Sequence, residues 1–178
     1  MDIMELVKLT TRAWSLEILT GLNEGVPGRQ APLLARTGAS RTAFRDSLDH
    51  LFQLGLLERN PGHGHPLRPE FRLTEKGQAL AMTAATITGV SDKAGRALLR
   101  KSWTVPVLAL TMTPSRFTGI KHGLPGITDR ALSKSLEGLQ DQQWIRRDVD
   151  VRARPLRPTY QAVNAGRQIA LVTQGFAG

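Results

Sequence analysis

Cysteine is absent from this chain of 178 residues. Its absence excludes disulfides, thiolate metal sites, cysteine nucleophiles and thiol-based redox sensing, and is typical of a reducing compartment. Long apolar runs are also missing, since no stretch of about 18 apolar residues occurs. The first ten residues carry Asp2 and Glu5 where a secretory signal would carry cations. We therefore expect a cytoplasmic protein.

Residue groups that mark catalytic sites are missing as well. The sequence has no glycine-rich phosphate loop, no Ser-His-Asp arrangement and no cluster of metal-ligating residues. His63 and His65 could form half of a metal site, but the lack of a nearby acidic or thiol partner favours a polar loop tip. We therefore predict that the protein is not an enzyme and needs no cofactor or metal.

Acidic residues are few relative to basic ones. The chain has 24 Lys and Arg against 15 Asp and Glu, which gives a formal net charge of +9. Residues 1–89 carry ten cations against nine acids, whereas residues 90–178 carry fourteen against six. This surplus indicates a polyanionic partner that meets the second half of the chain, with a solvated basic surface as the alternative.

The chain contains an internal repeat. Residues 38–71 and 126–160 follow the same plan, at an offset of 88 that becomes 89 within the second part of the repeat. Eleven aligned positions are identical, where unrelated sequences would share roughly two or three. We therefore expect two domains, at 1–82 and 101–178, joined by a helical linker at 83–100.

Each copy contains a helix with one apolar stripe. Ser40 and Thr128 are suited to cap these helices, because their hydroxyl groups can accept the free backbone N–H two or three residues on. Apolar side chains then recur at i, i+4 and i+7, so that they share one helix face. They are Phe44, Leu48 and Leu51 in the first copy and Leu132, Leu136 and Leu139 in the second.

A short helix precedes each of these helices, and a two-stranded hairpin follows it. The first hairpin is expected to pair residues 56–59 with 70–73. The second is expected to begin at 144–145, to have its loop at 146–158 and to return at Tyr160.

The remaining segments are predicted from caps and apolar positions. Thr74 is expected to cap a helix that runs into the 80s, and Ser91 a further short helix. The chain after Gly166 should form only one or two helical turns. Trp14 and Trp103, at equivalent places in the two copies, are expected in the cores.

Helix, turn, helix and then a two-stranded hairpin is the winged-helix plan. In this plan the second helix enters the major groove of DNA, and the hairpin wing lies along the backbone or the minor groove. The predicted fold class is therefore mainly α with small β-hairpins (α+β), built as two tandem winged-helix domains.

Several segments of the sequence also resemble those of a known family. The second copy, with SWTVPVLAL, TPSRF and GLPGITDRALSKSLEGL before a basic, proline-rich wing, resembles the HxlR type of bacterial winged-helix transcription regulator. The first copy, with AWSLEIL, LFQLGLLER and FRLTEKGQAL, resembles the broader HxlR and MarR-like group. The resemblance implies binding of double-stranded DNA, control of transcription and association with the nucleoid.

In the family, cations on the exposed face of the second helix meet DNA. Arg130 and Lys134 stand at the matching places, four residues apart and so on one face. They can donate to guanine O6 and N7 or to phosphates. Asp129 is expected to serve the helix N-terminus, with acceptance from cytosine N4 as the alternative. The expected DNA-binding residues of the second copy are Arg116, Thr128, Arg130, Ser133, Lys134, Arg146, Arg147, Arg152, Arg154 and Arg157.

The first copy departs from this pattern. Thr42 and Asp46 stand where the second copy has its two cations, and Arg41 and Arg45 come one place earlier. This copy is expected to bind DNA more weakly, to bind a partner, or to pair with the second copy as the subunits of a dimer do. Its expected DNA-binding residues are Ser40, Arg41, Thr42, Arg45 and Arg68.

Two winged-helix domains in one chain allow more than one assembly and more than one function. The chain can act alone as an intrachain pseudo-dimer, or it can form a homodimer with four winged-helix domains. An architectural or protein-interaction module of a chromosome-organising complex stays open as an alternative function. So does replication initiation on iterated sites.

Overall fold

The computed structural model describes residues 2–60, 70–150 and 157–176, and these form two compact units. The first unit spans Arg12–Gly89, and the second combines Met1–Thr11 with Val90–Gly178. The N-terminal segment therefore packs with the second half of the chain. The segment expected as a linker, 83–100, is divided between the units, and the domain ranges 1–82 and 101–178 stay a prediction.

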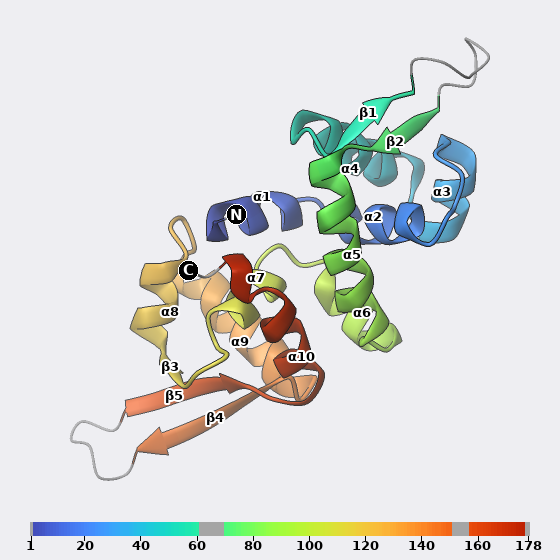
Figure 1. Ribbon diagram of the computed structural model, residues 1–178. Helices are drawn as coiled ribbons and strands as arrows, with labels where there is room; N and C mark the ends of the chain where they lie inside the picture. The colour runs from blue at the N-terminus through green and yellow to red at the C-terminus, as the bar shows by residue number, and fades with distance from the viewer. Residues whose placement is uncertain (1, 61–69, 151–156, 177–178) are drawn as a thin grey trace. The chain divides into compact units, whose positions relative to one another are not determined.

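The first unit contains the winged-helix order of elements (Figure 1). Helix α2 packs against α5, which returns after the hairpin, and against α4. Ile18 and Leu19 of α2 and Ala84 and Ile87 of α5 are buried in the core that results. The elements are α2 (Ser15–Asn23), α3 (Gln30–Thr37), α4 (Arg41–Gln53), β1 (Leu57–Arg59), β2 (Phe71–Leu73) and α5 (Glu75–Gly89).

The second unit repeats this order and adds elements at both ends. Its helix α7 is buried along its whole length and contacts α1, α9 and α10. The strands form an antiparallel sheet in the order β3-β5-β4. The elements are α1 (Ile3–Thr10), α6 (Lys93–Leu99), α7 (Thr104–Ala109), β3 (Ser115–Arg116), α8 (Phe117–Gly123), α9 (Asp129–Asp141), β4 (Ile145–Asp150), β5 (Arg157–Ala162), α10 (Asn164–Val172) and a 3-10 turn η1 (Gln174–Phe176).

The N-terminal helix α1 is anchored in the second unit. Leu6 and Leu9 are buried, and the hydroxyl group of Thr10 donates to the carbonyl oxygen of Ser102 at 2.8 Å. Apolar burial and this long-range hydrogen bond together fix the helix, although about 80 residues separate it in sequence from the rest of the unit.

The helices of the repeat are equivalent in length and capping. Both α4 and α9 have 13 residues and begin at an offset of 88. The backbone N–H of Ala43 donates to the hydroxyl oxygen of Ser40 at 3.3 Å, and that of Ala131 donates to Thr128 at 3.2 Å. The predicted caps are therefore confirmed. The predicted stripes are buried in both copies: Phe44, Leu48 and Leu51, and Leu132, Leu136 and Leu139.

A close backbone contact joins each hairpin to the helix that follows it. A Cβ atom added to Gly77 would lie 2.0 Å from the carbonyl oxygen of Leu56, and one added to Gly166 would lie 2.2 Å from that of Trp144. No other residue fits these positions without a backbone shift, because the atom met is backbone in both cases. Packing thus explains why glycine occurs at both of these equivalent positions in the repeat.

Several local predictions are wrong. The residue that caps α6 is Asp92, whose carboxylate accepts from the backbone N–H of Gly95 at 2.7 Å, and not Ser91. Trp14 and Trp103 are half-buried at the starts of their helices, whereas Trp144 is buried and packs against α6. By contrast, the chain after Gly166 forms the predicted one or two turns, since α10 ends at Val172 and the buried Ile169 and Ala170 hold it on the core.

The helices of the described residues are too short or too polar to span a membrane.

Candidate nucleic-acid interface

Helix α9 presents two exposed cations in its N-terminal half. Arg130 and Lys134 are exposed, as are Thr128 and Ser133, because the apolar stripe takes the opposite face. Neither cation forms an ion pair or hydrogen bond within the described part of the chain. Asp129 differs, since its carboxylate pairs with the ammonium group of Lys121 in α8. The N-terminal end of a recognition helix is the part that meets base edges, so the two cations are well placed for DNA.

The two arginines at the start of β4 point to opposite faces of the hairpin. Arg146 lies opposite Gln161, and Arg147 lies opposite Tyr160. Side chains alternate along a strand, and Arg147 therefore shares its face with the buried Ile145. The predicted loop at 146–158 is too long, because pairing continues to Asp150 and resumes at Arg157.

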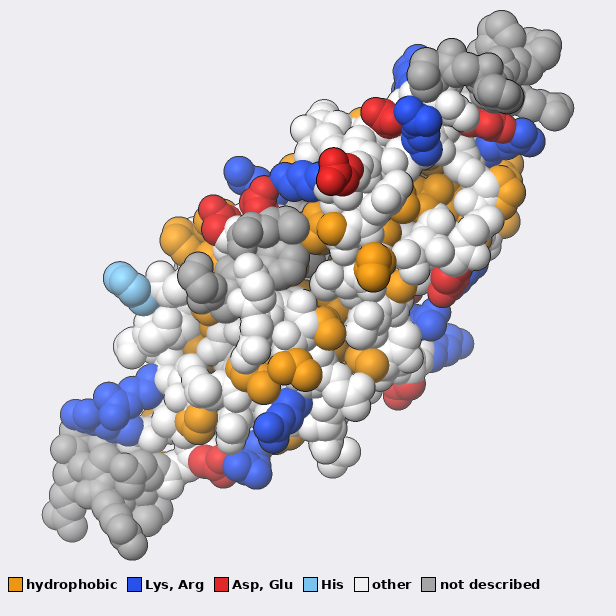
Figure 2. Space-filling model, in the orientation of Figure 1, with side chains coloured by type: hydrophobic (Ala, Val, Ile, Leu, Met, Phe, Trp, Pro, Cys, Tyr) orange, Lys and Arg blue, Asp and Glu red, His pale blue; other side chains and the backbone are white. Residues whose placement is uncertain are grey.

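The outer face of this sheet collects the other cations of the hairpin. Arg116 of β3 is in register with Thr159 of β5, and Arg157 lies two residues from Thr159 in the same strand, so both point to one face. Arg146 is in register with Gln161, which also lies two residues from Thr159, and it therefore shares this face. Arg116 and Arg157 are exposed. Lys and Arg side chains gather over the outer part of the β4–β5 hairpin in Figure 2. This sheet face therefore carries three arginines, together with Asp148, which is in register with Thr159.

Arg146 is partly neutralised. Its Nε donates to the carboxylate of Asp148 at 2.8 Å, and a terminal nitrogen lies 3.4 Å from the side-chain oxygen of Gln161. Both members of the ion pair are more than half exposed, so the pair is weak and can open for a phosphate.

Several cations of the first unit are paired with acids. Arg45 lies 3.8 Å from Asp49 in α4, and Arg72 lies 2.6 Å from Glu58 across the hairpin. Arg29 pairs with Glu70. Acidic side chains are accordingly interleaved with basic ones around the β1–β2 hairpin in Figure 2. The first unit has nine Lys and Arg against seven Asp and Glu, whereas the second has fifteen against eight, so the charge asymmetry holds for the units.

Comparison with models of known families identifies the family of this chain. The model of the HxlR-like helix-turn-helix family matches residues 9–95 and again residues 98–177. The chain belongs to the HxlR-like helix-turn-helix family. This is a family of DNA-binding transcription regulators, and the two matches confirm that the winged helix occurs in tandem. No match was found among curated proteins or among solved structures.

The HxlR-like fold brings part of the predicted residue set together. In the second unit, Thr128, Arg130, Ser133 and Lys134 lie on α9, and Arg116, Arg146, Arg147 and Arg157 on the sheet. In the first unit, Ser40, Arg41, Thr42 and Arg45 lie at and within α4, all exposed. Arg68, Arg152 and Arg154, together with His63 and His65, fall outside the described residues. The DNA-binding role of each residue stays a prediction.

One neighbouring cation was missed from the sequence. Lys101 lines a hollow of about 310 Å³ together with Lys134, Glu137 and Asp141 of α9. No spacing rule connects Lys101 to a helix that starts 28 residues later, and only the tertiary fold places them together. In the described part of this HxlR-like chain, no group of three or more His, Asp or Glu is arranged to hold a metal ion.

Asp148→Ala is expected to raise the affinity for duplex DNA by about three- to tenfold at low salt, because it removes a negative charge and releases Arg146. The slope of log affinity against log salt should become steeper by about 1. Fluorescence anisotropy with a labelled duplex measures both quantities. Glu75→Ala removes the same charge from the other unit and should change affinity less than about twofold. Equal effects of the two variants would contradict a role for Arg146.

Proposed function

We propose that this HxlR-like protein is a sequence-specific, double-stranded-DNA-binding regulator of transcription in which the second unit makes the stronger contacts. The observation that carries the proposal is the difference between the two recognition helices. In its N-terminal half, helix α9 has two exposed cations that pair with no acid in the described part of the chain, whereas α4 has Thr42 and Asp46 at the equivalent positions.

Helix α9 would enter the major groove with Arg130 and Lys134 toward the bases and the adjacent phosphates. An arginine can bind guanine O6 and N7 with two hydrogen bonds, while a lysine acts as a point charge. The hydroxyl of Thr128 accepts the capping hydrogen bond, and its own hydrogen stays available to donate to a phosphate. Ser133 offers a further hydroxyl beside the two cations.

The sheet would position the helix on the duplex. Arg116, Arg146 and Arg157 share one exposed face and suit the phosphates that flank the groove. Arg147 lies on the opposite face, which continues toward the core, and would not share the phosphates bound by these three arginines. Asp129 would act through its ion pair with Lys121, which joins α8 to α9, and not by accepting from a base.

The first unit would add weaker contacts through Ser40, Arg41, Thr42, Arg45 and Arg68. A chain with two winged helices can then serve as an intrachain pseudo-dimer on two half-sites, working in the cytoplasm at the nucleoid. Light scattering of the protein with a bound duplex would show whether one chain or two bind.

Salt dependence of binding tests the proposal. Duplexes of about 30 base pairs are first selected by the protein from a random library, and their affinity is then measured between about 50 and 300 mM salt. If about five cations contact phosphates, log affinity should fall with log salt at a slope of about −4.5. Failure to retain any duplex at about 50 mM salt would contradict DNA binding, and selection without an enriched motif would contradict sequence specificity.

A further inference from the structure

The first unit contains a hollow that shares only Arg45 with the residues proposed to contact DNA. It has a volume of about 750 Å³ and lies between the start of α3, one face of α4 and the β1–β2 hairpin. Sites for small organic ligands have volumes of about 300–1,000 Å³. The described residues that line it all belong to the unit Arg12–Gly89, so the inference does not depend on the second unit.

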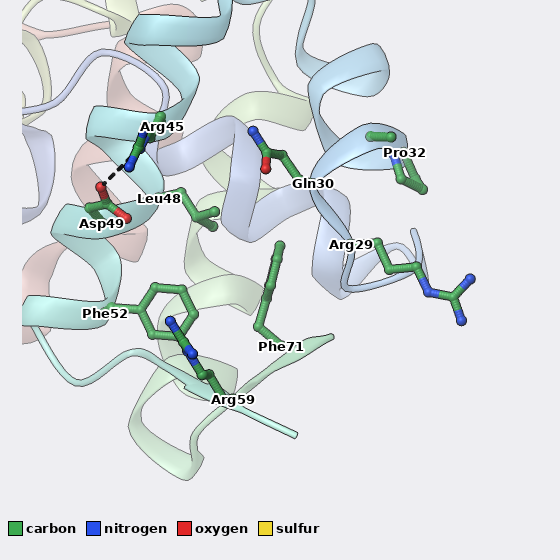
Figure 3. Close-up of a pocket in the computed structure, with 10 residues that line it drawn as sticks. Arg29, Gln30, Pro32, Arg45, Leu48, Asp49, Phe52, Arg59 and Phe71 are labelled. Atoms are coloured by element: carbon green, nitrogen blue, oxygen red, sulfur yellow. Dashed lines mark ion pairs between the residues drawn. The ribbon is translucent and has the colours of Figure 1, made fainter. Parts of the chain in front are cut away.

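Aromatic rings form the apolar part of this hollow. Phe52 and Phe71 meet edge to face, with ring centroids 5.9 Å apart and an interplanar angle of 78°. Leu48 extends the apolar surface along α4. Figure 3 shows both rings directed into the same space. Phe52 is only half-buried although it is a large apolar side chain, which leaves part of its ring open to a ligand.

Two guanidinium groups border the hollow. Arg59 is exposed, lies opposite Phe71 in the hairpin register and forms no ion pair within the described residues. Arg45 is held only loosely, at 3.8 Å from Asp49, and is 77% exposed. Arg29 also lines the hollow, but its guanidinium group points away from the rings in Figure 3 and is bound to Glu70. Arg59 and Arg45 are therefore available to an incoming anion.

The second unit does not reproduce this combination. At the positions of Arg45 and Phe52 it has Ser133 and Gln140, and the amide of Gln140 donates back to the carbonyl oxygen of Leu136 at 3.1 Å. It keeps the cation and the ring of the hairpin, as Arg147 opposite Tyr160. Thus the first unit differs at the two helix positions that add a ring and a second cation.

We propose that the hollow of the first unit binds a small aromatic carboxylate. The flat body of such a ligand packs against Phe52 and Phe71, where aromatic rings gain from edge-to-face or offset contact. Its carboxylate accepts hydrogen bonds from Arg59 and Arg45, and guanidinium groups bind carboxylates with charge-assisted and often bidentate hydrogen bonds. Gln30, at the start of α3, lines the hollow and offers a further donor.

Calorimetric titration of the full chain with 2-naphthoate tests this site. Saturable binding of one ligand per chain is expected, with a Kd below about 1 mM. Neither inorganic phosphate, which lacks the ring, nor 2-naphthylmethylamine, which reverses the charge, should bind at about 5 mM. Absence of saturable binding of 2-naphthoate at that concentration, or equal binding of the amine, would overturn the proposal.

Variants locate the ligand. Arg59→Gln changes an exposed side chain and should weaken 2-naphthoate binding at least about tenfold, as should Phe52→Gln, which introduces the residue of the second unit. Arg147→Gln, the equivalent change in the second unit, should leave binding unchanged. A loss with Arg147→Gln, or none with Arg59→Gln, would place the ligand elsewhere and refute this site. The folded fraction of each variant is checked by thermal unfolding.

Discussion

Replacing Arg130 and Lys134 together by alanine is expected to weaken binding to a selected duplex about a hundredfold at low salt. Each side chain is exposed and has no ion-pair partner among the residues that the structure describes, so each can form a charge-assisted contact. Such a contact to a base or phosphate contributes about 1–3 kcal/mol. Fluorescence anisotropy titration with the labelled duplex measures the change. Thermal stability should be unaffected, because neither side chain is part of the core.

The control for this experiment lies in the repeat itself. Arg41→Ala with Arg45→Ala removes the same two charges from the other recognition helix, and should weaken binding less than about tenfold. If the two double variants lost affinity equally, the second unit would not dominate the contacts. If the Arg130 and Lys134 variant kept full affinity, α9 would not be the reading helix.

Gly166→Ala should destabilise the second unit by about 3 kcal/mol, even though alanine is the better helix former. The added Cβ atom would lie 2.2 Å from the carbonyl oxygen of Trp144, and so the start of α10 must move away from the hairpin. For a unit of this size, the loss corresponds to a fall of about 15 °C in Tm. Thermal unfolding followed by circular dichroism measures it.

Gly119→Ala provides the contrast. Gly119 lies inside α8, and apart from its chain neighbours and the backbone of its own helix, no atom of the described residues lies within 4 Å of where its Cβ would be. Since the substitution reduces the conformational freedom of the unfolded chain without a clash, it should stabilise by about 0.5–1 kcal/mol. A Gly166→Ala variant as stable as the parent would mean that the close contact between α10 and the hairpin is not maintained in solution.

Local sequence rules predicted the elements that depend on neighbours in the chain. The hydroxyl caps at Ser40 and Thr128 and the stripes at i, i+4 and i+7 could be found because both depend on residues within two helical turns. The repeat then carried the winged-helix assignment from one copy to the other. In the candidate site, the exposure of Arg130 and Lys134 follows from the same periodicity.

Features that depend on distant segments could not be found in this way. Strand β3 has only two residues, too few for an alternation pattern, and exists because it pairs with β5. The ion pair between Arg146 and Asp148 requires both residues to be in a strand, where the sequence predicted a loop. Lys101 joins the surface of α9 only through the packing of the helices around it.

The anchoring of α1 on the second unit makes the first unit an insertion in a discontinuous domain. During synthesis the whole first unit leaves the ribosome before the residues that bury Leu6 and Leu9 have been made. The second unit therefore completes its folding last, because α1 can pack only after the later segments of this unit have been synthesised. A recombinant fragment that starts at Val90 would lack this helix and expose the surface it covers, whereas a fragment of Arg12–Gly89 would keep its own core intact.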